Sequence, residues 1–354
     1  MDIPSGLIDT SAIRRTGART DSIHSQFKSG KLVRIRRGFY VEVSHWLDAR
    51  PWERFAWSVA AATRSIPGAI LCRESAALVS GIPVLRTPGH VELLTPHQSQ
   101  SGRRKPTFQV MGDGPSAKQI RSNGDYPLRY YALPDSEYAL RDLECETHGE
   151  FRCTGLLRTA LDISFSTRLS QALVVADGVA RALWKRGEMN QEGSLLDADA
   201  IGAALEGHPR EAARKRARIA LRLAHPMVES AGESYSRAAF QYLGFEQPVL
   251  QHEIKDLEGF VGRSDFWWPG QGRAKGVVGE FDGKAKYADA DLRNGLTAEE
   301  VLYREKLRED RIRDLGYGFV RWGWAHVDNP ERLRQKLLGA GLTPSLGASR
   351  RNPF

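Results

Sequence analysis

The chain has 354 residues, of which 41% are hydrophobic, and its 51 basic and 43 acidic residues give a net charge of +8. Single hydrophobic cores seldom grow past about 250 residues, so this length predicts two or three domains. The hydrophobic content excludes a disordered chain. The positive charge favours a polyanionic partner, although simple solubility would also explain it.

Cysteine usage and hydropathy exclude further classes of protein. Cys72, Cys145 and Cys153 lack CxxC spacing, which excludes a disulfide framework and a four-cysteine zinc site. The opening MDIPSGLIDT lacks the features of a signal peptide, and nowhere do about 18 apolar residues follow one another. We therefore expect a soluble, cytoplasmic protein without a membrane partner.

Residues 1–48 predict a small winged helix-turn-helix. One short helix begins at Ser11 and ends at Gly17, a second lies in DSIHSQFKSG, and KLVRIRRGFYVEV then predicts a basic hairpin. In such a module the second helix enters the major groove of DNA and the wing contacts phosphates. A basic, solvated face on a small helical subdomain is the alternative. The candidate DNA-binding residues are Arg19, Lys28, Lys31, Arg34, Arg36 and Arg37.

Three stretches of the first half carry a resemblance to a known family. They are the segment from the first helix to RIRRGFYV, AILCRESAALVSGIPV (69–84) and CTGLLRTALDIS (153–164). Together they resemble the winged helix and central region of AbiEi-type antitoxins. The resemblance implies a non-enzymatic type IV antitoxin that represses its own promoter, with a nucleotidyltransferase-type toxin as its partner.

Residues 49–225 predict an α/β central region without catalytic residues. ERFAWSVAAATRSI and RESAALVSGI show helical periodicity, and HVELLTP and TFQVMG are typical of strands. The histidines are scattered without the spacing of metal ligands, and Ser75 lacks the GxSxG turn of a nucleophilic serine. His225-Pro226 then predicts a domain boundary.

Residues 226–340 predict a third domain, and we expect residues 341–354 to form a disordered tail. Ser230 and Glu233 fit a capping box that opens a helix. Two antiparallel strands and a third strand, VVGEFDG, follow, and then a long helix and a short strand. The order helix, three-stranded meander, helix and strand is typical of the PD-(D/E)xK restriction-endonuclease-like α/β fold. The predicted fold class is thus multidomain α+β.

Acidic residues interrupt the apolar strands of this third domain. Strand alternation places Val278, Glu280 and Asp282 on one face, and an antiparallel pairing can set Asp265 beside Glu280. Two such carboxylates can bind Mg²⁺ or Mn²⁺, which neutralises charge on a phosphodiester and activates water. Edge-strand and turn positions would explain the same acids without a metal.

The phrases GRSDFWWP, VVGEFDGKAKY and YREKLREDRIRDLGYGFVRWGWAHV resemble very-short-patch-repair-like endonuclease domains. The resemblance implies that Asp265, Glu280 and Asp282 bind the metal and that Glu233 supports them. The pattern's usual lysine position is occupied by Asp282, which leaves Lys286, or alternatively Lys284, as the catalytic lysine. The expected function is DNA binding with metal-dependent cleavage of DNA in a defence or toxin–antitoxin context. A nuclease-like domain that only binds DNA stays the alternative.

Overall fold

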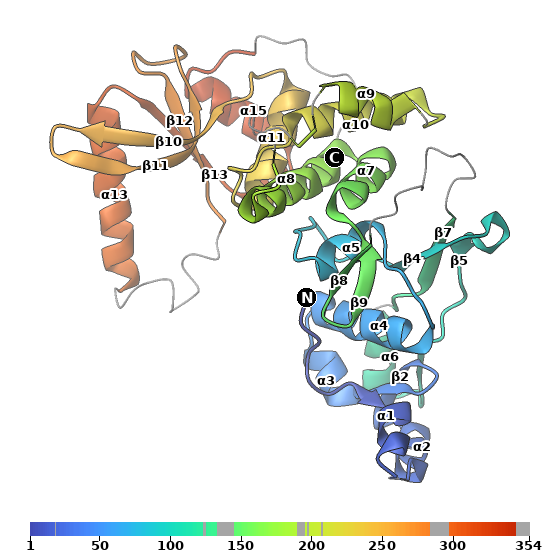
Figure 1. Cartoon of the computed structure of the whole chain (residues 1–354). Helices are drawn as coiled ribbons and strands as arrows, with labels where there is room; N and C mark the ends of the chain where they lie inside the picture. The colour runs from blue at the N-terminus through green and yellow to red at the C-terminus, as the bar shows by residue number, and fades with distance from the viewer. Residues whose placement is uncertain are drawn as a thin grey trace. The chain divides into compact units, whose positions relative to one another are not determined.

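The structure is a computed structural model. It describes residues 1–17, 19–122, 125–132, 145–189, 195–196, 198–206, 208–283 and 297–344 (Figure 1). The protein is a mixed α/β chain that divides into two compact units, Met1–Ile163 and Ser164–Phe354. The three-domain division with boundaries after residues 48 and 225 stays a prediction. No helix in the described ranges has both the length and the apolarity to span a bilayer.

The first unit begins with small helices and a sheet. Its elements are β1 (Ile8–Asp9), α1 (Thr10–Arg15), α2 (Asp21–Lys28), β2 (Leu32–Arg36), β3 (Phe39–Glu42), α3 (Val43–Asp48), α4 (Pro51–Ser65), α5 (Arg73–Val79), β4 (Val91–Thr95), a 3₁₀ helix (Gln98–Gln100), β5 (Gly102–Arg103), β6 (Gln109–Val110), α6 (Pro115–Ser122), β7 (Leu128–Ala132), β8 (Cys145–His148) and β9 (Phe151–Thr154). Its sheets have the orders β1-β3-β2-β6, β4-β7-β5 and β8-β9. Helix α7 (Leu156–Ser166) follows β9.

Strand β2 separates two small cores because its side chains alternate between the faces of the sheet. Leu32 packs against Phe27 of α2 on one face. Val33 and Ile35 pack against Trp57 of α4 on the other face. The β1-β3-β2-β6 sheet is therefore covered by helices on both faces.

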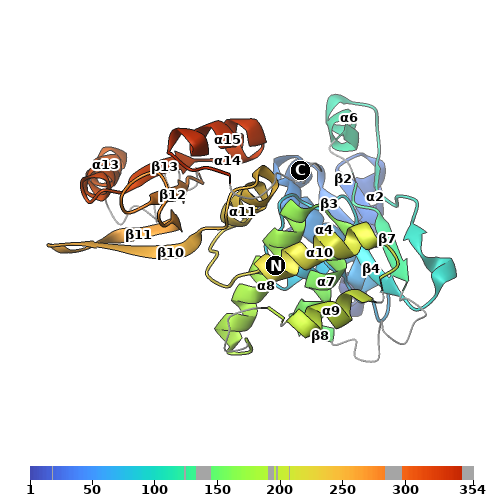
Figure 2. The ribbon, with the colours of Figure 1, turned by 90° about the horizontal axis from the view of Figure 1, so that it is seen from above.

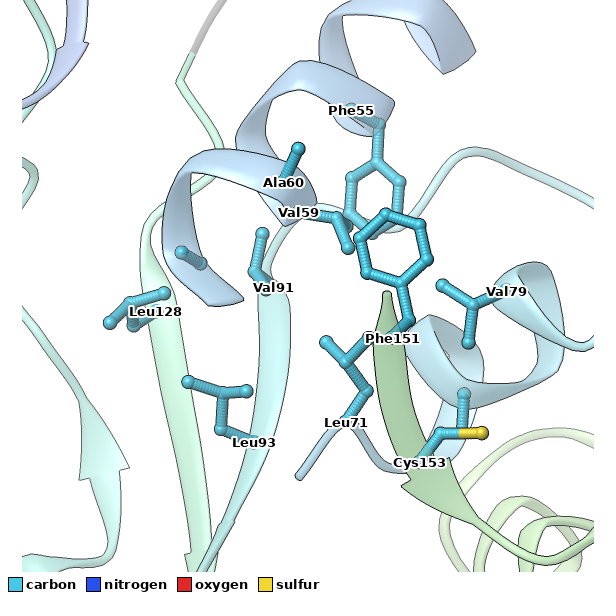
Figure 3. Packing of buried hydrophobic residues seen from close by; sticks show 12 residues of the cluster. Phe55, Val59, Ala60, Leu71, Val79, Val91, Leu93, Leu128, Phe151 and Cys153 are labelled. Carbon is cyan, nitrogen blue, oxygen red and sulfur yellow. The ribbon is translucent and has the colours of Figure 1, made fainter. Parts of the chain in front are cut away.

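The central part of this unit has its own apolar core (Figure 3). Phe55 and Val59 of α4 point toward Phe151 of β9, and Val91 and Leu93 of β4 belong to the same cluster. All five are at most 3% exposed. Burial of such side chains contributes about 1.5–3 kcal/mol each, so this cluster fixes α4 against the β4-β7-β5 sheet.

A buried carboxylate ties β4 to the first turn of α5. Glu92 Oε2 accepts hydrogen bonds from the backbone N–H groups of Glu74 at 2.9 Å and Ser75 at 3.4 Å. The Tyr131 hydroxyl donates to Glu92 Oε1 at 3.1 Å. Helix N-termini leave such N–H groups without intrahelical partners, so Glu92 has a structural role here.

The second unit combines a helical layer with a sheet. Its elements are α8 (Leu169–Arg186), α9 (Ala198–Glu206), α10 (Glu211–Leu223), α11 (Ala231–Leu243), β10 (Val249–Asp256), β11 (Gly259–Trp268), β12 (Val277–Phe281), α13 (Ala298–Asp314), β13 (Gly318–Trp322), α14 (Trp324–Val327) and α15 (Pro330–Gly339). The sheet order is β10-β11-β12-β13, with the last pair parallel and the others antiparallel. Both views show the β10–β11 ribbon extending beyond α11 (Figure 1 and Figure 2).

Helices cover both faces of this sheet. On one face Ile312 of α13 packs with Val261 and Val278. On the other face the ring of Phe240 in α11 meets those of Trp268 and Trp322, with centroids 5.1 and 5.6 Å away. The order α11, three-stranded meander, α13 and β13 agrees with the order predicted for residues 226–340.

An ion pair joins the helical layer to α11. Arg237 lies 2.8 Å from Asp177 of α8, and these side chains are only 5% and 1% exposed. The same Asp177 accepts a hydrogen bond from the His225 backbone, and Arg237 donates to the Leu223 carbonyl. Buried charges require such partners, so this pair fixes α8, the end of α10 and α11 in one arrangement.

Candidate acidic site and basic surface

Glu233 lies in the first turn of α11 as part of the predicted capping box. Ser230 Oγ accepts from the Glu233 backbone N–H at 3.2 Å and donates to Glu233 Oε1 at 2.7 Å. Glu233 Oε2 accepts from the Glu229 backbone N–H at 2.9 Å and from Gln251 Nε2 at 3.4 Å. The carboxylate is thus held in one position at the helix N-terminus, where negative charge is favourable.

Asp265 extends the β11–β12 pairing through its side chain. The last paired residues toward this end are Phe266 and Gly279. Beyond them, Asp265 Oδ2 accepts a hydrogen bond from the Phe281 backbone N–H at 2.8 Å. This bond fixes the carboxylate beside the end of β12.

Gly232 lets the Phe281 ring pack directly on α11. A methyl group at Gly232 would lie 2.0 Å from Phe281 Cε1, far inside van der Waals contact. The edge of the Phe281 ring also meets Trp324, with centroids 5.2 Å apart. The close packing brings the first turn of α11 next to the end of β12, and so brings Glu233 near Asp265.

The charge of Asp265 acts on Glu233. Glu233 is 6% exposed, and burial together with the negative charge of Asp265 raises its pKa from 4.5 to about 7. Desolvation is the larger cause. The sequence predicted Glu280 as the acid beside Asp265, whereas the acid that feels the charge of Asp265 is Glu233.

Glu280 is engaged by two arginines. Its Oε1 accepts from Arg308 of α13 at 2.6 Å and its Oε2 accepts from Arg321 of β13 at 2.7 Å. Arg321 also lies 2.9 Å from Glu305. Arg308 packs over Gly262 of β11 to reach Glu280.

The remaining predicted residues follow β12. This strand ends at Phe281, so the expected strand face shared by Glu280 and Asp282 stops before Asp282. The Asp282 backbone N–H donates to the Trp322 carbonyl at 2.7 Å, and the residue is half-buried. Lys284 and Lys286, the candidate catalytic lysines, lie outside the described residues.

Gln251 is a member of the site that the sequence did not reveal. Its backbone φ of +53° is in the left-handed region, which a side-chain-bearing residue rarely adopts within a strand. Its amide nitrogen reaches Glu233. Such backbone strain is concentrated at functional sites, and here it brings a hydrogen-bond donor to the buried carboxylate.

The acids suit a hard cation by their chemistry. Carboxylate oxygens are the ligands that Mg²⁺ and Mn²⁺ prefer, and the close pair Glu233 and Asp265 would gain from a neutralising charge. No group of three Asp, Glu, His or Cys side chains in the described ranges lies close enough together to hold a metal ion. Asp265, Glu280 and Asp282 are therefore not assembled as a ligand set while Glu280 contacts Arg308 and Arg321.

We expect Glu233→Gln to stabilise the protein at high pH. The pKa of Glu233 is about 7 in the folded state and about 4.5 in the unfolded chain. Between about pH 4.5 and 7 the Glu233 carboxyl is therefore protonated in the folded state but ionised in the unfolded chain. Stability therefore falls as pH rises from about 4.5 to 7 and is constant above. Glutamine keeps an amide oxygen for the Glu229 N–H, so the gain at pH 8 is about 2–3 kcal/mol.

Urea denaturation from pH 5 to 8 measures this difference. Glu253→Gln is the control, since Glu253 lies on β10 in an exposed pair with Lys255. Wild type and the control should lose stability over this range, and Glu233→Gln should lose much less. Parallel profiles for all three proteins would show that Glu233 does not bind the proton.

Three of the predicted DNA-binding residues are exposed cations in the first unit. Lys28 ends α2, Lys31 precedes β2, and Arg37 lies in the turn between β2 and β3. Arg19 is also exposed, and it pairs with Asp21 at 2.7 Å. Exposed lysines and arginines of this kind can reach phosphate groups without losing internal contacts.

The two arginines of β2 have internal partners. Arg34 donates to Gln109 Oε1 and its guanidinium lies 5.2 Å from the centre of the Phe27 ring. Arg36 is half-buried, and its Nε donates to Ser65 Oγ at 2.9 Å. These two predicted DNA-binding residues therefore contact neighbouring residues of the protein.

No known protein-family profile and no curated protein sequence matches this chain. The resemblances to AbiEi-type antitoxins and to very-short-patch-repair-like endonucleases therefore rest on the residues quoted above and stay predictions.

Proposed function

We propose that this chain is a DNA-binding protein whose C-terminal domain is a Mg²⁺-dependent endonuclease with a PD-(D/E)xK-type fold. The observation that carries the proposal is the buried carboxylate of Glu233, whose pKa is raised by burial and by the charge of the half-buried Asp265, at the junction of α11, β11 and β12. A perturbed carboxylate beside a second acid is typical of catalytic sites. The order of elements in 226–340 supports the same fold.

The residues of the chain would act as follows. Asp265 and Glu233 would hold the cation, the first fixed by the Phe281 amide and the second by Ser230. When bound, the cation would polarise the phosphodiester and favour a hydroxide nucleophile. Glu280 would join the ligands on leaving Arg308 and Arg321, which would free both arginines to contact DNA phosphates.

Cleavage of supercoiled plasmid by the purified protein tests the proposal. We expect nicked and linear products with Mg²⁺ or Mn²⁺ and none with EDTA. Asp265→Asn, purified in parallel, excludes a contaminating nuclease if it is inactive. Absence of products from wild type with either cation, or equal products from both proteins, would contradict the proposed activity.

The second candidate function is an AbiEi-like antitoxin and autorepressor that binds DNA without cleaving it. The contacts of Glu280 with Arg308 and Arg321 favour it, because these neutralise an acid that a nuclease would need for the metal. It is preferred if wild type shifts DNA in a gel but leaves plasmid intact with Mg²⁺ and Mn²⁺. Its proposed partner would be a nucleotidyltransferase-type toxin.

Both functions include a winged helix that docks on DNA, and the exposed cations test it. We expect Lys31→Ala with Arg37→Ala to weaken binding to any duplex sequence and to reduce the slope of log K against log salt by about 2. Fluorescence anisotropy between about 50 and 200 mM salt measures this slope. Arg64→Ala is the control, since Arg64 pairs with Glu150 at 2.6 Å. An unchanged slope in the double variant would remove these two residues from the DNA interface.

A further inference from the structure

A pocket of about 260 Å³ opens between β2 and β7 in the first unit. Its lining combines cations, aromatic rings and one acid. The residues that carry the argument are Arg36, Arg104, Lys105, Asp125, Tyr126 and Tyr130. The pocket and the acidic site belong to different units, so occupancy of one can be measured without the other.

The pocket has an excess of positive charge. Arg36 donates to Ser65 Oγ and Arg104 donates to the Gln100 carbonyl at 2.5 Å, both neutral acceptors. Within the described ranges, neither arginine nor Lys105 has a carboxylate within ion-pair distance. Burial lowers the pKa of Arg36, as expected for a cation that is partly desolvated without a counter-ion. An anion in the pocket would supply that counter-charge.

Aromatic rings form rigid walls beside the cations. The Tyr126 ring packs edge-on against Phe55, and its hydroxyl donates to the Pro51 carbonyl at 3.0 Å. The Arg104 guanidinium lies 4.9 Å from the centre of the Tyr130 ring, which holds this cation at the wall. A flat ring of a ligand can pack against such walls without reorganising them.

Asp125 supplies an acceptor that lacks a donor. Its Oδ2 is buried and has no hydrogen-bond partner among the described residues. Burying such an atom costs about 1–3 kcal/mol unless a donor reaches it. An amino group on a ligand's ring would meet this requirement.

We propose that this pocket binds a mononucleotide that carries an exocyclic amino group. The phosphate would lie among Arg36, Arg104 and Lys105, and the base would pack on the tyrosines with its amino group toward Asp125. Guanidinium groups bind phosphate through two parallel hydrogen bonds, which suits Arg104 at the pocket wall. A volume of about 260 Å³ is below the range of drug-sized ligands, and it suits one nucleotide rather than a strand.

Isothermal titration of the full chain with adenosine monophosphate tests the proposal. We expect saturable binding that is at least about tenfold tighter than that of inorganic phosphate or adenosine, since each lacks one of the two recognised groups. Arg104→Ala should weaken the binding of adenosine monophosphate at least about tenfold. Asp125→Asn should weaken the binding of adenosine monophosphate but leave the binding of inorganic phosphate unchanged. Both substitutions are at the pocket lining, and circular dichroism checks that the fold is retained.

Arg103→Ala is the matched control, because Arg103 neighbours Arg104 on the same segment but does not line the pocket. Its affinity should stay within about twofold of wild type. No saturable binding by wild type, or equal losses in Arg103→Ala and Arg104→Ala, would overturn the proposal. If a single-stranded tetranucleotide bound more tightly than adenosine monophosphate, and this binding depended on Arg104, the pocket would be a DNA-binding site. That result would overturn the proposal of a free mononucleotide as the ligand.

Discussion

Arg237→Met is expected to destabilise the protein by about 3–5 kcal/mol, because it leaves the Asp177 carboxylate buried without its cation. Arg237 lies 2.8 Å from Asp177, and the side chains are 5% and 1% exposed. Burial already raises the pKa of Asp177, and the arginine opposes that rise. Removal of the guanidinium also deprives the Leu223 carbonyl of its donor.

Urea denaturation of wild type and Arg237→Met at pH 7 measures this loss. Arg334→Met is the control, since Arg334 forms a partly exposed pair with Glu331 at 3.6 Å and should cost less than about 1 kcal/mol. Adding Asp177→Leu to Arg237→Met should restore part of the stability, because no unpaired charge then remains. Equal losses for Arg237→Met and Arg334→Met would show that the buried pair does not hold the helices together.

Local sequence patterns predicted the elements of the second unit well. The capping box of Ser230 and Glu233 forms, and α11 begins directly after Ser230. Strand β12 spans Val277–Phe281 within the predicted VVGEFDG segment, and α13 follows it as expected. Caps and alternation depend on neighbours within a few residues, which is why they are readable from the sequence alone.

Side-chain partners depended on residues far along the chain and could not be read in this way. Asp177 and Arg237 are 60 residues apart. Strand parity placed Glu280 on a face of the sheet, but it could not show that Arg308 and Arg321 occupy the same face. The same reason applies to Arg34, whose partner Gln109 is 75 residues away.

If Asp265 binds the metal as proposed, Asp265→Asn is expected to lower plasmid cleavage at least about 100-fold, since loss of a metal-binding carboxylate removes several kcal/mol of transition-state stabilisation. The substitution should preserve the fold, because an asparagine oxygen can still accept from the Phe281 N–H, the bond that Asp265 makes at 2.8 Å. Glu253→Gln, an exposed acid on the adjacent strand β10, should cleave as wild type does.

The same variant should melt at a higher temperature than wild type at pH 8, and this distinguishes a catalytic acid from a structural one. Asp265 raises the pKa of Glu233, so removing its charge relieves a repulsion in the folded state. If Glu233 and Asp265 hold the cation as proposed, Mg²⁺ should raise the melting temperature of wild type but not of Asp265→Asn. A carboxylate kept for stability would show the reverse, a lower melting temperature with Asp265→Asn and no response of wild type to Mg²⁺. Functional sites that concentrate charge commonly reduce stability, and Glu233 with Asp265 would be such a site.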